Sequence, residues 1–160
     1  MIIDKPSTLS AIEPAILYRL KTMTPDRLAL IAEVGEGLEN RISDSAQKYN
    51  SLEEILNAVK TKRYTMARLR RIVIQTLLGI TSRIQNTPVP YLRVLGIKSG
   101  CDDMLKNAGL PLIIKTKADY EKLDDSAKEI FDIDINASHA MNIALKGAVI
   151  NEFTQPLLKV

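Results

Sequence analysis

A run of residues from Lys60 to Arg71 carries six cations and no acid, and it leads directly into the apolar segment from Ile72 to Ile80. Since the whole chain has a formal net charge of only +3, the rest of the chain is net acidic, and the basic character is local. The cations are Lys60, Lys62, Arg63, Arg68, Arg70 and Arg71. Any fold of this chain has to bury the apolar segment while its basic neighbour stays in water.

The run predicts a helix that begins at Thr65 and continues to about Ile80 or Arg83. The Thr65 hydroxyl can accept a hydrogen bond from a backbone N–H of the first turn, which is the usual role of threonine at this position. At about 100° per residue, the apolar side chains then share one face. They are Leu69, Ile72, Val73, Thr76, Leu77 and Ile80. We therefore expect a buried rod whose arginines point outward at a basic, solvated end.

Cations at the N-terminus of a helix are unfavourable for folding, because the helix macrodipole is already positive there. The penalty is about 0.3 to 1 kcal/mol for each exposed cation. Free N–H groups, the macrodipole and a guanidinium cluster together form an anion site, and a nucleic-acid backbone is the commonest large anion for such a site. A solvated charged face is the alternative. Because Arg68 and Arg71 lie off the apolar stripe, their replacement by alanine is predicted to weaken RNA binding with little effect on stability.

Length and composition fit one domain, with a possible seam near residues 84 to 90 between a helical and a mixed lobe. At 160 residues and 46% hydrophobic residues, the chain can bury a full core. No segment is long and apolar enough to span a membrane, and the N-terminus lacks the apolar core of a signal peptide. The single cysteine, Cys101, excludes an internal disulfide and fits a reducing compartment. A cytoplasmic protein is therefore expected.

Capping signals and apolar periodicity predict further helices before the basic run. A helix is expected from about residue 8 to residue 23, with its start trimmed by a proline. Thr24 and Pro25 supply the cap and first turn of the next helix, which extends toward Leu38 unless the glycines around Glu36 interrupt it. A helix then resumes toward Tyr49. The capping box that begins at Ser51 opens a short helix before the basic run.

The chain beyond residue 90 predicts a different architecture. Two short apolar segments, Tyr91–Leu95 and Pro111–Lys115, have the features of strands, and a helix-length segment from Ser99 to Gly109 separates them. A strand–helix–strand unit of this kind has parallel strands and a right-handed crossover. A short helix after Thr116 and a longer one from Asp125 or Ser126 to Gly147 follow, and the tail is expected to be extended or irregular. The predicted fold class is α+β, predominantly α-helical: a helical bundle with a small parallel βαβ unit.

The motifs of common catalytic and nucleotide-binding sites are absent from the sequence. There is no glycine-rich phosphate loop, which argues against an ATP site in this chain. His139 is the only histidine, so paired-histidine metal sites are excluded, and a structural or surface role is expected for it. Asp132 and Asp134 diverge by about 200° on a helix, so we expect caps, ion-pair partners or solvated groups rather than a cooperating carboxylate pair. We therefore expect no catalytic, metal or cofactor residues here.

The chain resembles the C-terminal domain of the bacterial tRNA(Met) cytidine acetate ligase family, formerly a domain of unknown function. The resemblance rests on the segments Glu36–Glu39, Lys62–Arg71 and Tyr91–Leu105. Within them, Lys-Arg-Tyr-Thr-x-x-Arg at Lys62 joined to Arg-Val-Leu-Gly at Arg93 is the specific combination. The segment Asp134–Ser138 is similar to the family's Asp-x-x-Ala-Thr pattern, with serine in place of threonine.

The resemblance implies an ATP-dependent ligase that adenylates acetate and acetylates N4 of the wobble cytidine of elongator tRNA(Met). In that family the adenylation site and its ATP belong to an N-terminal nucleotidyltransferase domain, which this sequence is expected to lack. The chain is therefore expected to be the tRNA-binding part, catalytically silent when incubated alone with ATP, acetate and tRNA. Partners implied are tRNA and that N-terminal domain, with no membrane.

Roles are predicted for eight residues. We expect phosphate contacts from Lys62, Arg63, Arg68 and Arg71, electrostatic help from Lys60 and Arg70, and a sugar or base contact from Tyr64. Arg93 is expected either to reach RNA or the missing domain, or to anchor a buried carboxylate such as Glu36 or Glu39. With 4% aromatic residues, recognition of the RNA backbone is favoured over base stacking. A protein-docking domain with a basic patch and a small enzyme for a phosphorylated metabolite are the alternatives.

Overall fold

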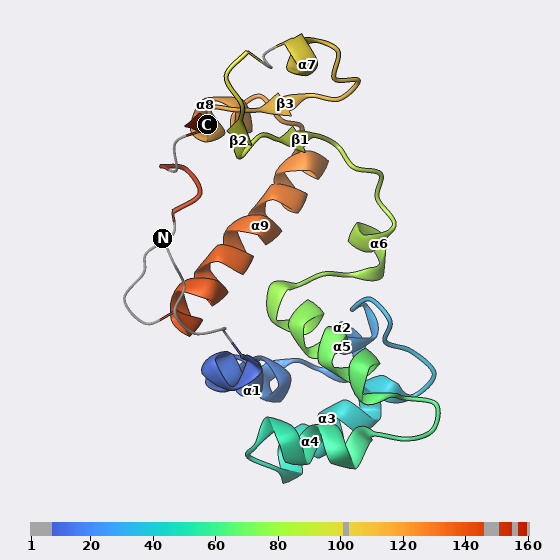
Figure 1. The fold of residues 1–160 in the computed structure, drawn as a ribbon. Coiled ribbons are helices and arrows are strands. Elements are labelled where there is room, and N and C mark those ends of the chain that lie inside the picture. The colour runs from blue at the N-terminus through green and yellow to red at the C-terminus, as the bar shows by residue number, and fades with distance from the viewer. Residues whose placement is uncertain (1–7, 101–102, 146–150, 155–156, 160) are drawn as a thin grey trace. The chain divides into compact units, whose positions relative to one another are not determined.

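The computed structural model describes residues 8–100, 103–145, 151–154 and 157–159. The chain divides between Thr87 and Pro88 into two compact units (Figure 1). Unit 1 is formed by the residues before this division together with residues 143–145, and it is helical. Unit 2 is formed mainly by residues 88–142, together with the described residues beyond 150, and contains the strands.

The first helices of unit 1 begin where the capping signals predict. A 3-10 helix η1, Leu9–Ile12, leads into α1, Glu13–Thr22, which has a proline in its first turn. Helix α2, Pro25–Ala29, is capped by Thr24, whose Oγ1 accepts a hydrogen bond from the N–H of Arg27 at 3.4 Å. The expected extension of this helix toward Leu38 is wrong. The chain leaves helical geometry soon after Ala29, and Glu33 adopts a φ of +64° that an α-helix does not allow.

The remaining helices of unit 1 surround the basic run. They are α3, Leu38–Lys48, α4, Leu52–Val59, α5, Met66–Leu78, and α6, Ser82–Gln85. Ser51 Oγ accepts from the N–H of Glu54 at 3.1 Å, which confirms the cap of α4. Helix α5 ends at Gly79, whose left-handed φ of +78° stops the helix earlier than the predicted Ile80 or Arg83.

The predicted apolar stripe of α5 forms the centre of the core of unit 1. Leu69, Ile72, Val73 and Thr76 are buried, and α5 packs on α1 and α4. The buried residues of the core from the other elements include Ile16, Leu20, Leu28, Leu38, Ile42, Ile55 and Val59. The stripe is therefore confirmed for these four residues, whereas Leu77 is partly buried and Ile80 lies beyond the end of α5.

Several cations of unit 1 are used to satisfy carbonyl groups at helix C-termini. Lys21 Nζ donates to a carbonyl in the last turn of α3 at 2.6 Å. Arg41 Nη2 donates to the carbonyl of Ala58 in α4 at 2.9 Å, and Arg19 Nε donates to the carbonyl of Thr76 in α5 at 3.4 Å. A cation at this pole of a helix is favourable, because the last carbonyls are unpaired and the macrodipole is negative there. These three cations therefore serve the fold.

Loss of the Thr65 cap is expected to destabilise unit 1. Thr65 Oγ1 accepts from the N–H of Arg68 at 3.4 Å at the start of α5. Replacing Thr65 with alanine should lower the free energy of unfolding by about 1 kcal/mol, the typical cost of a lost threonine cap. Urea denaturation of the variant measures this loss. Thr22→Ala, which removes an exposed hydroxyl at the end of α1, is the control and should change stability by less than about 0.5 kcal/mol.

Unit 2 contains the predicted parallel βαβ unit (Figure 1). Strand β1, Leu92–Arg93, pairs in parallel with β3, Leu112–Ile113, and helix α7, Asp103–Lys106, lies between them in sequence. The register pairs Leu92 with Leu112 and Arg93 with Ile113. A second parallel pair joins β2, Gly96–Ile97, to β4, Leu158–Lys159. This pairing was missed, because the tail was expected only to be extended or irregular.

Two helices complete unit 2, α8, Thr116–Tyr120, and α9, Asp125–Ala144. Asp124 Oδ1 accepts from the N–H of Ala127 at 2.8 Å, so the cap of α9 lies one residue before the predicted start. The expected end at Gly147 and the expected role of Cys101 lie outside the described residues. Phe131 of α9 is fully buried among Tyr91, Ile113 and Ala127, which form the core of the unit.

Two kinds of feature are not found in the part of the chain that the structure describes. No helix there combines the length and hydrophobicity needed to cross a bilayer. No cluster of three or more His, Cys, Asp or Glu side chains there could hold a metal ion.

Candidate nucleic-acid interface

An acidic loop, residues 33–36, contacts the basic end of α5. Arg71 forms a two-pronged ion pair with Glu33, from Nε to Oε1 at 2.9 Å and from Nη2 to Oε2 at 2.7 Å. This hydrogen bonding holds the pKa of the Glu33 carboxyl below its usual value. Arg68 Nη2 donates to the backbone carbonyl of Glu33 at 2.7 Å. Arg68 and Arg71 are therefore both occupied by one residue of the loop.

Tyr64 and Arg63 contact the other end of the acidic loop. Tyr64 is only 6% exposed, and its hydroxyl donates to the carbonyl of Glu36 at 3.3 Å. The guanidinium of Arg68 lies 5.4 Å from the centre of the Tyr64 ring and covers it. Arg63 pairs with the Glu36 carboxylate, and both side chains are about 60% exposed. The predicted contact of Tyr64 with a sugar or base is not supported by this burial, which gives the ring a packing role.

The backbone of the acidic loop is strained at the two glutamates that bind these arginines. Glu33 has a φ of +64° and Glu36 a φ of +59°. This left-handed region is uncommon for residues other than glycine, and such residues cost on the order of 1 kcal/mol or more. Glycine would relieve the strain but would remove the carboxylates. The two strained positions therefore carry the carboxylates that pair with Arg71 and Arg63.

The expectation that the arginines of the basic run all point outward is wrong for Arg68, whereas Arg71 is exposed as expected but is paired with an acid. The run is free of acid in sequence, but the loop from Glu33 to Glu36 supplies acids in space. Arg68 is half-buried, and Arg71 is fixed by Glu33. Because replacing Arg68 or Arg71 would break contacts with Glu33 within unit 1, we now expect their removal to lower stability.

Three cations of the run have no internal partner among the described residues and can bind an external anion. Lys60, Lys62 and Arg70 are exposed, and none of them forms an ion pair with another residue in the described ranges. Arg63 is exposed as well, and its pair with Glu36 is of the solvent-screened kind that contributes at most about 1 kcal/mol. We name Lys60, Lys62, Arg63 and Arg70 the open basic surface. It is the part of the predicted interface that an anion can reach.

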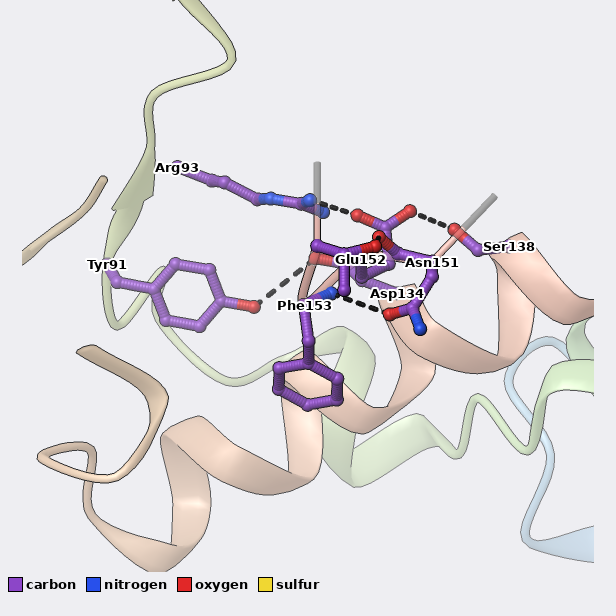
Figure 2. Close-up of polar contacts among 8 residues, drawn as sticks. Tyr91, Arg93, Asp134, Ser138, Asn151, Glu152 and Phe153 are labelled. Atoms are coloured by element: carbon purple, nitrogen blue, oxygen red, sulfur yellow. Dashed lines mark hydrogen bonds and ion pairs between the residues drawn. The ribbon is translucent and has the colours of Figure 1, made fainter. Parts of the chain in front are cut away.

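Arg93 belongs to a separate polar cluster in unit 2 (Figure 2). Its Nη2 pairs with Glu152 Oε2, and Ser138 Oγ donates to the other oxygen of Glu152. Glu152 is 8% exposed, and the Arg93 guanidinium lies 5.4 Å from the centre of the Phe131 ring. Of the two predicted roles, the structure supports the anchoring of a buried carboxylate. The suggested partners Glu36 and Glu39 were wrong.

Two tyrosines bind the two aspartates of α9 separately. Tyr91 donates to Asp134 Oδ2 at 3.3 Å, and Tyr120 donates to Asp132 Oδ1 at 2.9 Å. Desolvation raises the pKa of the Asp134 carboxyl, although Tyr91 and Arg93 act against the rise. Desolvation and the Asp134 charge also raise the pKa of Tyr91. The two aspartates therefore have different partners, in agreement with their predicted divergence on the helix.

Sequence reasoning missed the acids that organise both clusters. Glu33 and Glu36 lie beside Gly35 and Gly37, and this interruption of helical pattern was the only local signal that a loop would form there. Glu152 lies in a tail without periodicity, 59 residues from Arg93 in sequence. No local pattern could have paired them.

The fold matches that of known proteins. The solved structure of apo Thermotoga maritima TmcAL superposes with a TM-score of 0.80 at 22% identity, over 95% of this chain and 41% of that one. The same protein bound with alpha-thio ATP gives a TM-score of 0.82 at 22% identity, over 97% and 43%. At this identity, the likeness establishes a shared fold of the mostly helical α+β class.

Sequence comparison defines the family. The profile of the HIGH Nucleotidyl Transferase family matches residues 2–155, and the chain belongs to this family. The tRNA(Met) cytidine acetate ligase of Thermoanaerobacter pseudethanolicus is 35% identical over 163 residues, which cover 97% of this chain and 40% of that protein. The ligase of Alkaliphilus metalliredigens is 35% identical over 82% of this chain and 33% of its own length. The chain thus spans about 40% of its first relatives.

Proposed function

We propose that this chain is the tRNA-binding part of a tRNA(Met) cytidine acetate ligase. The observation that carries the proposal is the open basic surface at the N-terminal end of α5, in a chain similar to such ligases along nearly its whole length. Cations at this pole are unfavourable for the helix itself, whereas they attract a phosphate backbone. The position of these cations is therefore better explained by RNA binding than by the stability of the helix.

The residues divide into those that meet RNA and those that hold the surface in shape. Lys60, Lys62, Arg63 and Arg70 contact phosphates. Arg68 and Arg71 connect α5 to the acidic loop and keep the exposed cations in position. Arg93 acts inside unit 2, and its predicted contact with RNA or with a nucleotidyltransferase domain gives way to this structural role.

The whole enzyme would acetylate N4 of the wobble cytidine of elongator tRNA(Met), with ATP used to adenylate acetate. One solved relative binds an ATP analogue. In our proposal, the ATP and the acetyl transfer belong to an N-terminal nucleotidyltransferase domain that acts together with this chain, in the cytoplasm. We assign no catalytic, cofactor-binding or metal residue to this chain.

Titration of the chain with an elongator tRNA(Met) transcript tests the proposal. We expect saturable binding that is stronger for this transcript than for an RNA duplex of equal charge, because the shape of tRNA adds to the phosphate contacts. No binding in low salt would contradict the proposal. Binding to an acidic protein surface with no affinity for RNA would instead support a docking domain.

Neutralising Glu36 is expected to strengthen RNA binding. In Glu36→Gln, the Arg63 guanidinium loses its internal partner and becomes available to phosphate, so the affinity for tRNA should rise about two- to fivefold. Filter binding in 0.1 M salt measures the change. Glu54→Gln removes the same charge from an exposed position on α4 and is the control. Equal affinities of the two variants would show that Glu36 does not compete with RNA.

A further inference from the structure

A groove in unit 1 lies beside the open basic surface. It is formed by η1, α4 and α5 and has a volume of about 450 Å³. This volume is within the range of about 300 to 1,000 Å³ that small-molecule sites occupy. Arg70 lines the groove and also belongs to the open basic surface. The groove therefore shares one cation, Arg70, with the proposed RNA interface.

The floor of the groove is apolar. Leu9 from η1, Leu56 from α4 and Met66 from α5 line it, and Leu56 is nearly buried. Leu9 and Met66 pack against the core and are partly exposed. Aliphatic and thioether side chains of this kind present a surface on which a flat apolar face can pack. The floor is fixed by the core beneath it.

The rim carries three polar side chains that the fold does not use. Glu53 and Asn57 of α4 and Arg70 of α5 are exposed and line the groove. None of them forms a hydrogen bond or ion pair with another described residue. Glu13 lines the groove as well, but its Oε1 is occupied by the N–H of Leu52 at 2.6 Å. The rim thus offers an acceptor, an amide and a cation.

We propose that this groove binds one unpaired nucleobase of the RNA whose phosphates lie on the open basic surface. This inference rests on the proposed function. The flat faces of the base pack on the apolar floor, its edge faces Glu53 and Asn57, and Arg70 binds the adjoining phosphate. A Glu53 carboxylate accepts from the amino group of cytosine or adenine, whereas the one N–H donor on the edge of uracil lies between two carbonyl oxygens that repel a carboxylate, so the groove favours a base with an amino group.

The charge arrangement favours a nucleotide over a peptide. A peptide helix in this groove would leave Glu53 and Arg70 with partners that depend on its sequence. A nucleotide supplies both partners at once, an amino group at one end and a phosphate at the other. Glu53 of α4 and Arg70 of α5 both line the groove, and their opposite charges match the amino group and the phosphate of a single nucleotide.

Binding of three RNA hexamers to the full chain tests the proposal. The probes are hexacytidylate, hexauridylate and a hexacytidylate with abasic residues, which carry equal numbers of phosphates. We expect hexacytidylate to bind about five- to tenfold more tightly than either of the others. The salt dependence should be the same for all three, since it reports the phosphates alone. The Met66 methyl signal in NMR should shift with hexacytidylate and not with the abasic probe.

Variants of the rim complete the test. Glu53→Gln should make hexacytidylate and hexauridylate bind alike, and Asn57→Ala should reduce the preference, while salt dependence stays unchanged. Glu54→Gln, one residue along α4 and outside the groove, is the matched control. Salt-dependent binding of all three probes with no preference and no Met66 shift would overturn the base site and leave the RNA function standing. Absence of binding to any RNA would overturn both, and a Met66 shift with a peptide alone would assign the groove to a protein.

Discussion

Replacing Arg93 with alanine is expected to destabilise unit 2 by about 3 to 5 kcal/mol, because the change leaves a buried carboxylate without its partner. Glu152 is 8% exposed, and its pairing with Arg93 and its bond from Ser138 compensate for its burial. The variant also loses the contact of the guanidinium with the Phe131 ring. A loss of this size is comparable to the total stability of a small unit.

Urea titration followed by the amide signals of Ile113 and Phe131 measures the effect on unit 2. Adding Glu152→Gln to Arg93→Ala removes the unpaired charge and keeps an acceptor for Ser138, so it should recover at least about 1 kcal/mol. Lys98→Ala removes an exposed cation of the same unit and serves as control. If Arg93→Ala unfolds in the same urea concentration as Lys98→Ala, the cluster does not hold the unit together.

Removal of the open basic surface is expected to have the largest effect on RNA affinity. Four cations that each neutralise a phosphate contribute a salt slope of about −3, taking about −0.7 to −0.9 per contact. Changing Lys60, Lys62, Arg63 and Arg70 together to alanine should therefore reduce affinity for tRNA on the order of a thousandfold in 0.1 M salt. All four side chains are exposed, so the variant should stay folded.

Arg68 and Arg71 provide the matched control for this variant. Arg68→Ala with Arg71→Ala removes two cations from the same helix, but these are already bound to Glu33. We expect this double variant to unfold more easily than the quadruple one while it keeps most of the salt slope. A quadruple variant that binds tRNA normally, beside a double variant that does not, would assign the RNA contact to the arginines under the acidic loop.

The helix starts could be predicted because the hydrogen bond that caps a helix forms between residues three apart in sequence. Thr24, Ser51 and Thr65 all accept the N–H that their positions predicted. The apolar stripe of α5 and the parallel pairing of β1 with β3 followed from periodicity and chain order. Capping hydrogen bonds and apolar periodicity, which involve residues close in sequence, therefore account for most of the elements of both units.

The candidate site could be predicted only in part, because its geometry depends on distant residues. The run from Lys60 to Arg71 identified the cations. Glu33, which lies 38 residues from Arg71, occupies Arg68 and Arg71, and its contacts therefore determine which cations remain free to bind RNA. The pairing of Arg93 with Glu152 and that of β2 with the two-residue strand β4 also cross long stretches of chain. Long-range partners of this kind have no period or cap that reveals them.

The salt dependence of tRNA binding tests the central claim most directly. Titrations of the unaltered chain with elongator tRNA(Met) at several salt concentrations should give a line of log K against log salt with a slope of about −3. The quadruple variant of the open basic surface should give a slope near zero. A slope shallower than about −1 in the unaltered chain, or one that the quadruple variant leaves unchanged, would contradict the assignment of this surface to RNA.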